Sequence, residues 1–408
     1  MLTQAVLLFY GTQFFPVGGR LEFFRFVCYG IVIIFGFMNL RKLKLRKPHM
    51  LDLIACGILA YAFFSITYSI HPKVTLYRSA GNLLLYLSVF WVFWISCRDP
   101  DQCYHFIQAL IFVWLLYYGL NMVFLYFRPN EAFQLTEATS YGVYHAHYRF
   151  AGITENPNGI GNFSAIVLPL IIWNQENRKN FISLLLLGAV VFSMFYSYSR
   201  DAFICGIIGL CFYLYLSKRR HGFFIFVVAL FLSILIYASS DFILRFLPTS
   251  LIRSESLAML GGRVEAWDVA IKLLKDHPFR GYGFGVEDLI FEHFGYAFQF
   301  HAGAYVHSSF LGLALQLGWI AAGVFYFVLV AFFIASLFKV LKLKGEYQLL
   351  AIALYVSCLT AFLTSFVESW LYSPGGIFAF PFFMFMMLLM RMLEFQKSPI
   401  RLTPRLRR

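Results

Sequence analysis

A histidine stands at the start of a long apolar run, where its side chain could do acid–base chemistry. Residues 301–319 read HAGAYVHSSFLGLALQLGW, so that His301 and His307 precede an apolar segment. An imidazole has an ordinary pKa of about 6.5, which suits a general base that works near neutral pH. A histidine at the start of a helix can equally be a surface residue or a capping partner, and spacing alone leaves that alternative open. His301 has no further signal and stays an unassigned loop residue.

Several arginines lie beside apolar runs, where a permanent charge needs a polar cavity or a partner. They are Arg200, in YSYSRDAF, and, in the stretch 251–285, Arg253, Arg263 and Arg280. A guanidinium presents a planar fork of N–H groups that matches phosphate and carboxylate oxygens. Each charge could instead reach toward the membrane surface or pair with an acid that is close in sequence, such as Asp201, Glu255 or Glu265.

The segment GGRVEAWDVAIKLLKDHP (261–278) has the pattern of an amphipathic helix. One apolar stripe contains Ala266, Ala270, Leu273 and Leu274. Arg263 and Trp267 are four residues apart and are therefore neighbours on one helical face. The His277-Pro278 pair is expected to end the helix. No strand precedes the following GYGFG (281–285) and no lysine follows it, which favours a tight turn with exposed backbone over a nucleotide loop.

Polar residues also precede a second apolar run, in YRFAGITENPNGIGNF (148–163). The Asn156-Pro157-Asn158-Gly159 sequence is a turn signal, and Arg149 lies just ahead of it. The amides of Asn156 and Asn158 could bind sugar hydroxyls, and helix capping by Asn158 is the alternative.

The rest of the chain supplies the elements that must hold these residues. Of its 408 residues 60% are hydrophobic and 13% charged, whereas soluble domains are about 45–50% apolar and about 25% charged. We therefore expect an all-α polytopic membrane protein, organised as a single membrane domain over residues 1–408. About twelve spans of near-membrane length are expected, at 3–18, 22–40, 50–68, 75–97, 103–127, 159–173, 181–198, 202–216, 222–240, 319–338, 347–369 and 377–393. The seven cysteines lie in or beside these runs without metal-ligand spacing, so we expect no disulfide and no zinc site.

Lysine and arginine cluster in alternate connections between the expected spans. The densest clusters are RKLKLRK (41–47), KRR (218–220) and the basic tail 394–408. The positive-inside rule places them, and both termini, on the cytoplasmic side. Two long loops, 128–158 and 241–306, then lie on the outer face, and we expect the longer one to form a helical lid. The net charge of +13 is then a topology and lipid-headgroup signal, and no nucleic acid is expected as a partner.

These motifs, in this order, resemble the O-antigen ligase and polymerase superfamily of bacterial envelope enzymes. The matching elements are SRDA (199–202), GGRVEAWDVAIKLLKDHPFRGYGFG (261–285), NPNGIG (156–161), the His-Ser start at 307–308 of a helix that reaches Gly318, and YSIHPKVTLYRSAGNLL (68–84). The resemblance covers about residues 60–390 and includes the number of spans. It implies a fold like that of the C-type membrane glycosyltransferases, with both long loops on the periplasmic side of the bacterial inner membrane.

The resemblance also implies an inverting, metal-independent glycosyltransferase without a cofactor. Its donor would be a glycan on undecaprenyl diphosphate, and its acceptor a second lipid-linked glycan or a lipid A core. By motif, Arg200 and Arg263 would bind the donor diphosphate and His307 would activate the acceptor hydroxyl, so these three are the expected catalytic residues. The expected substrate-binding residues are Arg149, Asn156, Asn158, Arg253, Trp267 and Arg280. Membrane lipids are further partners, and a chain-length regulator could be another.

The choice between polymerase and ligase depends on small differences. The ligase form of the His motif has Gly, Thr or Tyr three residues after its glycine, whereas Ala321 stands here. This departure and the IHPKVTLYRS element (70–79) favour a polymerase of O-antigen, capsule or exopolysaccharide, with an O-antigen ligase as the alternative. A transporter of the same lipid-linked glycan is a more distant reading, because it predicts charges deep within several spans and inverted repeats.

Overall fold

The computed structural model describes residues 22–38, 50–140, 143–154, 156–217, 224, 227–228, 263–296, 305–345, 347–373 and 377–395. Arg253, His301 and most of the basic tail lie outside the described residues. In the described part, the strands are β1 (Phe133–Ser140) and β2 (Val143–Phe150). The helices are α2 (Glu22–Met38), α3 (Met50–Phe64), α4 (Pro72–Tyr86), a π-helical turn (Leu87–Phe93), α5 (Trp94–Ser96), α6 (Pro100–Phe127), α7 (Pro129–Ala132), α8 (Pro157–Arg178), α9 (Phe181–Tyr196), α10 (Arg200–Ser217), α14 (Arg263–Asp276), α15 (Glu287–His293), α16 (Ser309–Lys342), α17 (Gln348–Thr364) and α18 (Ala379–Phe395). Short 3-10 turns cover Ser65–Thr67 and Gly152–Thr154.

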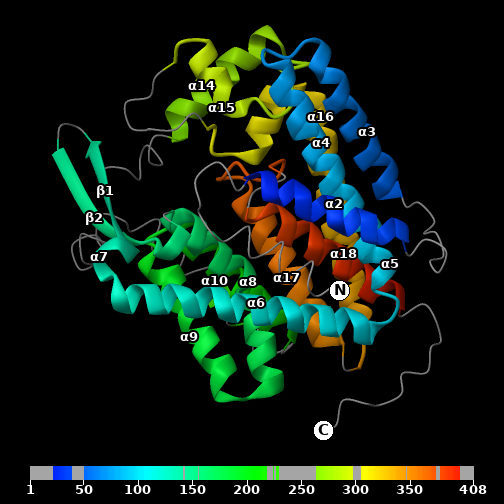
Figure 1. Cartoon of the computed structure of the whole chain (residues 1–408), viewed down its shortest axis with the longest axis vertical. Helices are drawn as coiled ribbons and strands as arrows, with labels where there is room; N and C mark the ends of the chain where they lie inside the picture. Colours follow the sequence, from blue (N-terminus) through cyan, green and yellow to red (C-terminus); the bar gives the residue numbers. More distant parts are fainter. Residues whose placement is uncertain are drawn as a thin grey trace.

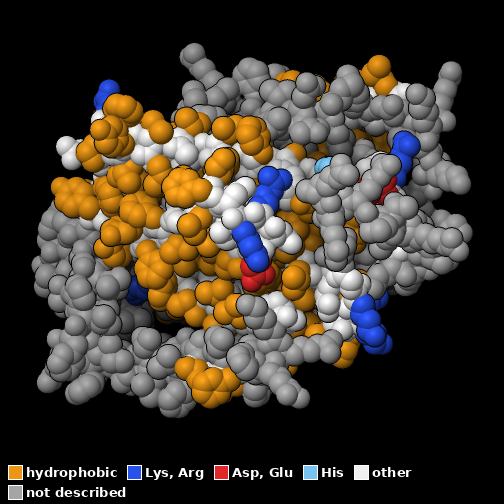
Figure 2. All heavy atoms as spheres, turned by 90° about the horizontal axis from the view of Figure 1, so that it is seen from below, with side chains coloured by type: hydrophobic (Ala, Val, Ile, Leu, Met, Phe, Trp, Pro, Cys, Tyr) orange, Lys and Arg blue, Asp and Glu red, His pale blue; other side chains and the backbone are white. Residues whose placement is uncertain are grey.

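Within the described residues, four helical segments are long and apolar enough to cross a membrane. They are Pro72–Ser96, Pro100–Phe127, Arg200–Ser217 and Ser309–Lys342. Shorter apolar helices occur at Val27–Met38, Leu51–Thr67, Phe181–Tyr196 and Gln348–Thr364. The expected spans 3–18 and 222–240 fall wholly or mostly outside the described residues, so the number of about twelve stays a prediction. On the face shown in Figure 2, hydrophobic side chains form a broad surface and charged side chains occur only in small groups.

One hairpin departs from the expected all-α fold. β1 and β2 pair antiparallel with Phe133 opposite Phe150, and the hairpin projects from the helices beyond α6 (Figure 1). The Phe150 ring lies 5.3 Å from that of Phe192 in α9, which anchors the base of the hairpin. β-Branched and aromatic residues recur along FQLTEATS and VYHAHYRF, and such residues favour a pleated strand. The all-α prediction is therefore confirmed for the described fold, with this one hairpin as an addition that was not predicted.

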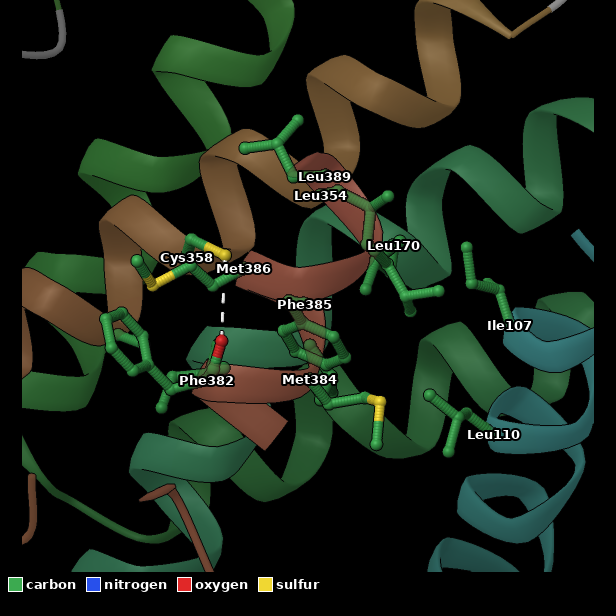
Figure 3. Packing of buried hydrophobic residues seen from close by; sticks show 14 of the residues in the cluster. Ile107, Leu110, Leu170, Leu354, Cys358, Phe382, Met384, Phe385, Met386 and Leu389 are labelled. Atoms are coloured by element: carbon green, nitrogen blue, oxygen red, sulfur yellow. Dashed lines mark hydrogen bonds between the residues drawn. The ribbon is translucent and has the colours of Figure 1, made fainter. Parts of the chain in front are cut away.

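The core forms where α17 packs against α8, α10 and α18, with α6 against α18. Figure 3 shows Leu354 and Cys358 of α17 against Phe382 and Met386 of α18. Gly209 of α10 permits a close approach to α17, because a Cβ there would lie 2.2 Å from Thr360 Oγ1. Small residues at helix contacts are the usual way for membrane helices to gain packing, since lipid removes most of the hydrophobic drive. This packed group supports one wall of the site described below.

Helix α16 is broken at Gly318, whose φ is 85° and ψ 165°. The GYGFG turn fills the break: Tyr282 N donates to Leu315 O and Gly283 N to Gln316 O, both at 3.0 Å. After the break, Trp319 N donates to Pro278 O at 2.8 Å. A helix can be interrupted inside a membrane protein only where other groups satisfy its freed backbone. The segment after α14 therefore fixes the first half of α16, which begins beside His307.

Candidate functional site

Helix α14 has the predicted boundaries and the predicted buried face. It spans Arg263–Asp276, so the His277-Pro278 pair follows it directly as expected. Its buried residues are Ala266, Ala270, Leu273 and Leu274, the predicted stripe. The Gly281, Gly283 and Gly285 backbones all have positive φ, which confirms the tight turn. The prediction that the backbone of this turn is exposed was wrong, because residues 281–285 are buried and the N–H groups of residues 282–285 bond to α16 and to Ser65.

Glu368, in the connection between α17 and α18, joins two of the three residues expected to carry the chemistry, Arg263 and His307. Its Oε1 accepts a hydrogen bond from Arg263 Nη2 at 2.6 Å, and its Oε2 lies 3.3 Å from His307 Nδ1. Arg263 Nη2 also lies 3.9 Å from Asp201 Oδ2. The partner of Arg263 is therefore a distant acid rather than its neighbour Glu265. Glu368 therefore lies between Arg263 and His307 and contacts both.

The backbone at His307 is held in an unusual conformation. Its φ is 53°, in the left-handed region that few non-glycine residues occupy. The preceding peptide is fixed from both sides, because Trp267 Nε1 donates to Val306 O at 2.9 Å and Val306 N donates to Glu287. The cap of α16 is Ser308, whose Oγ accepts from Leu311 N. The alternative that His307 itself caps the helix was therefore wrong.

Glu287, the first residue of α15, is a buried carboxyl beside this histidine. It is 2% exposed. It accepts hydrogen bonds from Val306 N at 2.8 Å and Ser369 Oγ at 2.7 Å, and from the Tyr372 hydroxyl. Burial raises the pKa of Glu287, and the hydrogen bonds from Tyr372, Ser369 and Val306 N and the charge of His307 oppose the rise. This carboxyl joins the segments that carry His307 and Glu368.

The residues of the 128–158 loop lie at the start of α8. Asn156 Oδ1 accepts from Gly159 N at 3.0 Å, so Asn156 is the N-cap of α8 and the alternative that Asn158 caps this helix was wrong. Asn158 Oδ1 instead accepts from Arg149, whose Nε donates to Ser197 O at 2.8 Å. Arg149 therefore ties the end of the hairpin to α8 and to the connection before α10.

A polar cavity of about 430 Å³ brings many of these residues together. It is lined by Tyr29, Tyr77, Arg78, Asn156, Asn158, Gly159, Asn162, Gly285, Glu287, Tyr305, His307, Glu368, Ser369, Tyr372, Ser373 and Phe378. Asn162 is 1% exposed, its Nδ2 donates to Asp201 at 2.8 Å, and its Oδ1 has no hydrogen-bond partner among the described residues. The cavity therefore offers charged groups, amides and hydroxyls on one wall.

Other predicted residues lie beside the cavity or away from it. Arg263 and Arg149 touch the lining residues Glu368 and Asn158, and Trp267 supports Val306. Arg200 begins α10, next to Asp201, and is not among the lining residues. Arg280 is exposed and lies 5.7 Å from the ring centroid of Tyr68, away from the lining residues.

Sequence reasoning missed Glu368, Glu287 and Arg78. Glu368 had a usable signal, since a carboxylate in TSFVESW follows the apolar span that ends near Thr364. Glu287 directly follows the GYGFG turn, and Arg78 lies inside the element YSIHPKVTLYRSAGNLL. The sequence around Glu287 and Arg78 did not indicate which residues these two side chains would contact.

The chain was also compared with known proteins. A family model described as O-antigen ligase matches residues 181–326, which include α9, α10, α14, α15 and the first half of α16. A search of curated proteins found no match. The members of that family are ligases or polymerases of O-antigen, which are glycosyltransferase-like enzymes. The matched region contains Arg200, Arg263 and His307, and the match is consistent with the O-antigen ligase/polymerase superfamily that the motifs resemble.

Proposed function

We propose that the protein is a membrane glycosyltransferase that transfers a glycan from undecaprenyl diphosphate to an acceptor hydroxyl inside the polar cavity. The observation that carries the proposal is the arrangement of Arg263, Glu368 and His307 at the wall of that cavity. It combines a base, a carboxylate that can orient the base and a permanent cation. We place the reaction on the periplasmic side of the bacterial inner membrane, with both termini in the cytoplasm.

In this proposal His307 is the general base. When Nδ1 carries a proton and donates it to Glu368, Nε2 is the atom that can accept the acceptor's proton. The acceptor oxygen attacks the anomeric carbon, the bond from that carbon to phosphate breaks, and undecaprenyl diphosphate leaves. One displacement inverts the anomeric configuration. A single general base contributes roughly 10²–10⁴-fold to such a rate.

The arginines stabilise the departing diphosphate. A lipid diphosphate is a good leaving group, so the reaction needs charge stabilisation more than acid assistance, and a fixed guanidinium supplies it without a metal ion. Arg263 lies at the site, and we retain Arg200 at the start of α10 as a second donor-binding residue. The amides of Asn158 and Asn162 line the cavity and suit sugar hydroxyls.

We propose a polymerase of O-antigen, capsule or exopolysaccharide, which joins one lipid-linked glycan to another. The match to a family described as O-antigen ligase favours the second candidate, in which the acceptor is a lipid A core. The two reactions share the donor site and differ in the acceptor.

The deciding experiment uses purified full-length protein in lipid nanodiscs. Undecaprenyl-diphosphate-linked glycan is supplied either alone or with lipid A core, and products are separated by size. A longer lipid-linked glycan with donor alone supports the polymerase, and a glycan on lipid A core supports the ligase. The proposal fails if neither product forms, or if the His307→Ala protein is as fast as the wild type. Activity that a chelator abolishes and a divalent ion restores would overturn metal independence.

A further inference from the structure

We propose that Arg78 is a further binding residue for the donor diphosphate, and that Asp288 holds its guanidinium group until the donor binds. This inference rests on the proposed function and adds a residue to its donor site. Arg78 lies outside the matched residues 181–326, and no role was predicted for it from the sequence.

The position of Arg78 carries the first part of the inference. Among the described residues that line the polar cavity, Arg78 is the single lysine or arginine. Arg263 reaches the cavity wall through Glu368 but is not itself a lining residue. An anion that enters the cavity therefore meets the guanidinium of Arg78 directly. The anions that suit this guanidinium share a phosphate group with several negatively charged oxygens.

The contacts of Arg78 explain how it stays available. Nη1 and Nη2 donate to the two carboxylate oxygens of Asp288 at 2.7 Å and 2.8 Å. The side chains are 35% and 21% exposed, so solvent reaches this ion pair and screens part of its attraction. A diphosphate carries more charge than one carboxylate and offers more acceptor oxygens. It can therefore compete with Asp288 for the same planar fork.

The backbone beside Arg78 leaves room for its side chain because the neighbouring residue is a glycine. Gly285 has a φ of +77°, and a Cβ there would lie 2.7 Å from Arg78 Cβ. Its carbonyl oxygen accepts a hydrogen bond from Arg78 Nη1. One turn further along α4, Asn82 Nδ2 donates to Tyr372 O at 3.0 Å and holds the helix against the cavity wall. The guanidinium is thus pre-oriented, which reduces the entropy lost when an anion binds.

The experiment measures binding rather than transfer. Full-length protein in nanodiscs of neutral lipid is titrated with undecaprenyl diphosphate, and Kd is compared for wild type, Arg78→Gln, Arg78→Lys, Asp288→Asn and Arg128→Gln. We expect Arg78→Gln to raise Kd about tenfold or more. Arg78→Lys should fall between Gln and wild type, because it keeps the charge but loses the fork. Asp288→Asn should lower Kd, because it removes the competing anion.

The controls separate this role from a structural one. Arg128 pairs with Glu131 on the surface and does not line the cavity, so Arg128→Gln should bind like the wild type. If Asp288→Asn weakens binding as much as Arg78→Gln does, the pair acts only as a structural unit and the inference is overturned. Wild-type Kd in Arg78→Gln also overturns it. Melting temperatures of all variants show whether a change in Kd reflects lost folding.

Two further arms identify the source of the phosphate and separate this inference from the proposed function. When phosphatidylglycerol replaces undecaprenyl diphosphate, the Kd should change little between wild type and Arg78→Gln. An equal change in Kd for both lipids would assign the site to general lipid headgroups and overturn the donor assignment. The proposed function fails if wild-type protein makes no longer glycan and no glycan on lipid A core. The inference fails alone if glycan is made while Arg78→Gln retains the wild-type KM for donor and the wild-type Kd.

Discussion

Two cavities share Tyr372 in their walls, and their linings differ in character. The larger, of about 430 Å³, is the polar cavity that holds His307, Glu368 and Arg78. The smaller, of about 130 Å³, is apolar and is lined mostly by side chains of α3, α4, α16 and α18. The polar residues that line this cavity include Asp52 and Tyr86, joined by a hydrogen bond of 2.7 Å.

The difference between the two linings shows at which positions a helical membrane protein can hold charged side chains. Most groups of the polar cavity lie at helix starts or in connections: Asn156 at α8, Glu287 at α15, His307 beside α16 and Glu368 after α17. Helix ends carry unpaired backbone groups that polar side chains must satisfy. Most residues of the apolar cavity lie within helices, whose backbone is already satisfied. We therefore expect substitutions in the polar cavity to affect chemistry and substitutions in the apolar cavity to affect stability.

The largest expected effect comes from removing the carboxylate that Arg263 and His307 share. Glu368→Ala should lower kcat by roughly 10²–10⁴-fold, because the imidazole loses the group that orients it. Glu394→Ala is the matched control, since it removes an arginine's acidic partner without touching the cavity. A Glu368→Ala enzyme with wild-type kcat would show that His307 needs no orienting carboxylate.

The next effect tests the break in α16 that fixes the wall of the polar cavity. Gly318→Ala should destabilise the fold by about 3 kcal/mol, because its φ and ψ suit glycine almost alone. A Cβ there would also lie 2.3 Å from the Phe279 carbonyl. Thermal unfolding in detergent measures the loss. Gly323→Ala is the control, because a Cβ there meets nothing within 4 Å. Equal melting temperatures for the two variants would contradict the account of the break.

A smaller effect is expected on the apolar side. Asp52→Ala should cost about 1–3 kcal/mol, because the Tyr86 hydroxyl loses a buried acceptor. Asp52→Asn keeps an acceptor oxygen and should cost less. Transfer activity measured below the melting temperature should be unchanged in both. Loss of kcat in a stably folded Asp52→Ala protein would remove the distinction between the two cavities.

The smallest expected effect concerns pH and Glu287. The native pKa of Glu287 is raised, so the native state favours the protonated carboxyl. Stability from this group is complete below the unfolded pKa of about 4.3 and is lost as pH rises through the native pKa. Glu287→Gln does not titrate, so its stability relative to wild type should rise with pH across that window. Melting temperatures over a pH series test this, and a constant difference would contradict it.

Local patterns predicted part of the site correctly. The α14 helix, its buried stripe and the turn at GYGFG were predicted because their signals are local: apolar spacing, a His-Pro stop and three glycines. Two details were wrong for the same reason. Asn158 was considered as the cap of α8 instead of Asn156, and His307 as the cap of α16 instead of Ser308. Neighbouring residues of similar chemistry compete for one cap, and only the backbone geometry chooses between them.

The sequence by itself determined that the chain is helical and apolar, and it identified Arg263 and His307 as residues able to do chemistry. Only the tertiary structure decided what those residues meet. Glu368 is 105 positions from Arg263 and 61 from His307, and Asp288 is 210 positions from Arg78. Periodicity reports the neighbours of a residue on its own helix. The pairing of charges across helices depends on how the broken α16 and the α17–α18 connection pack together, which no local pattern contains.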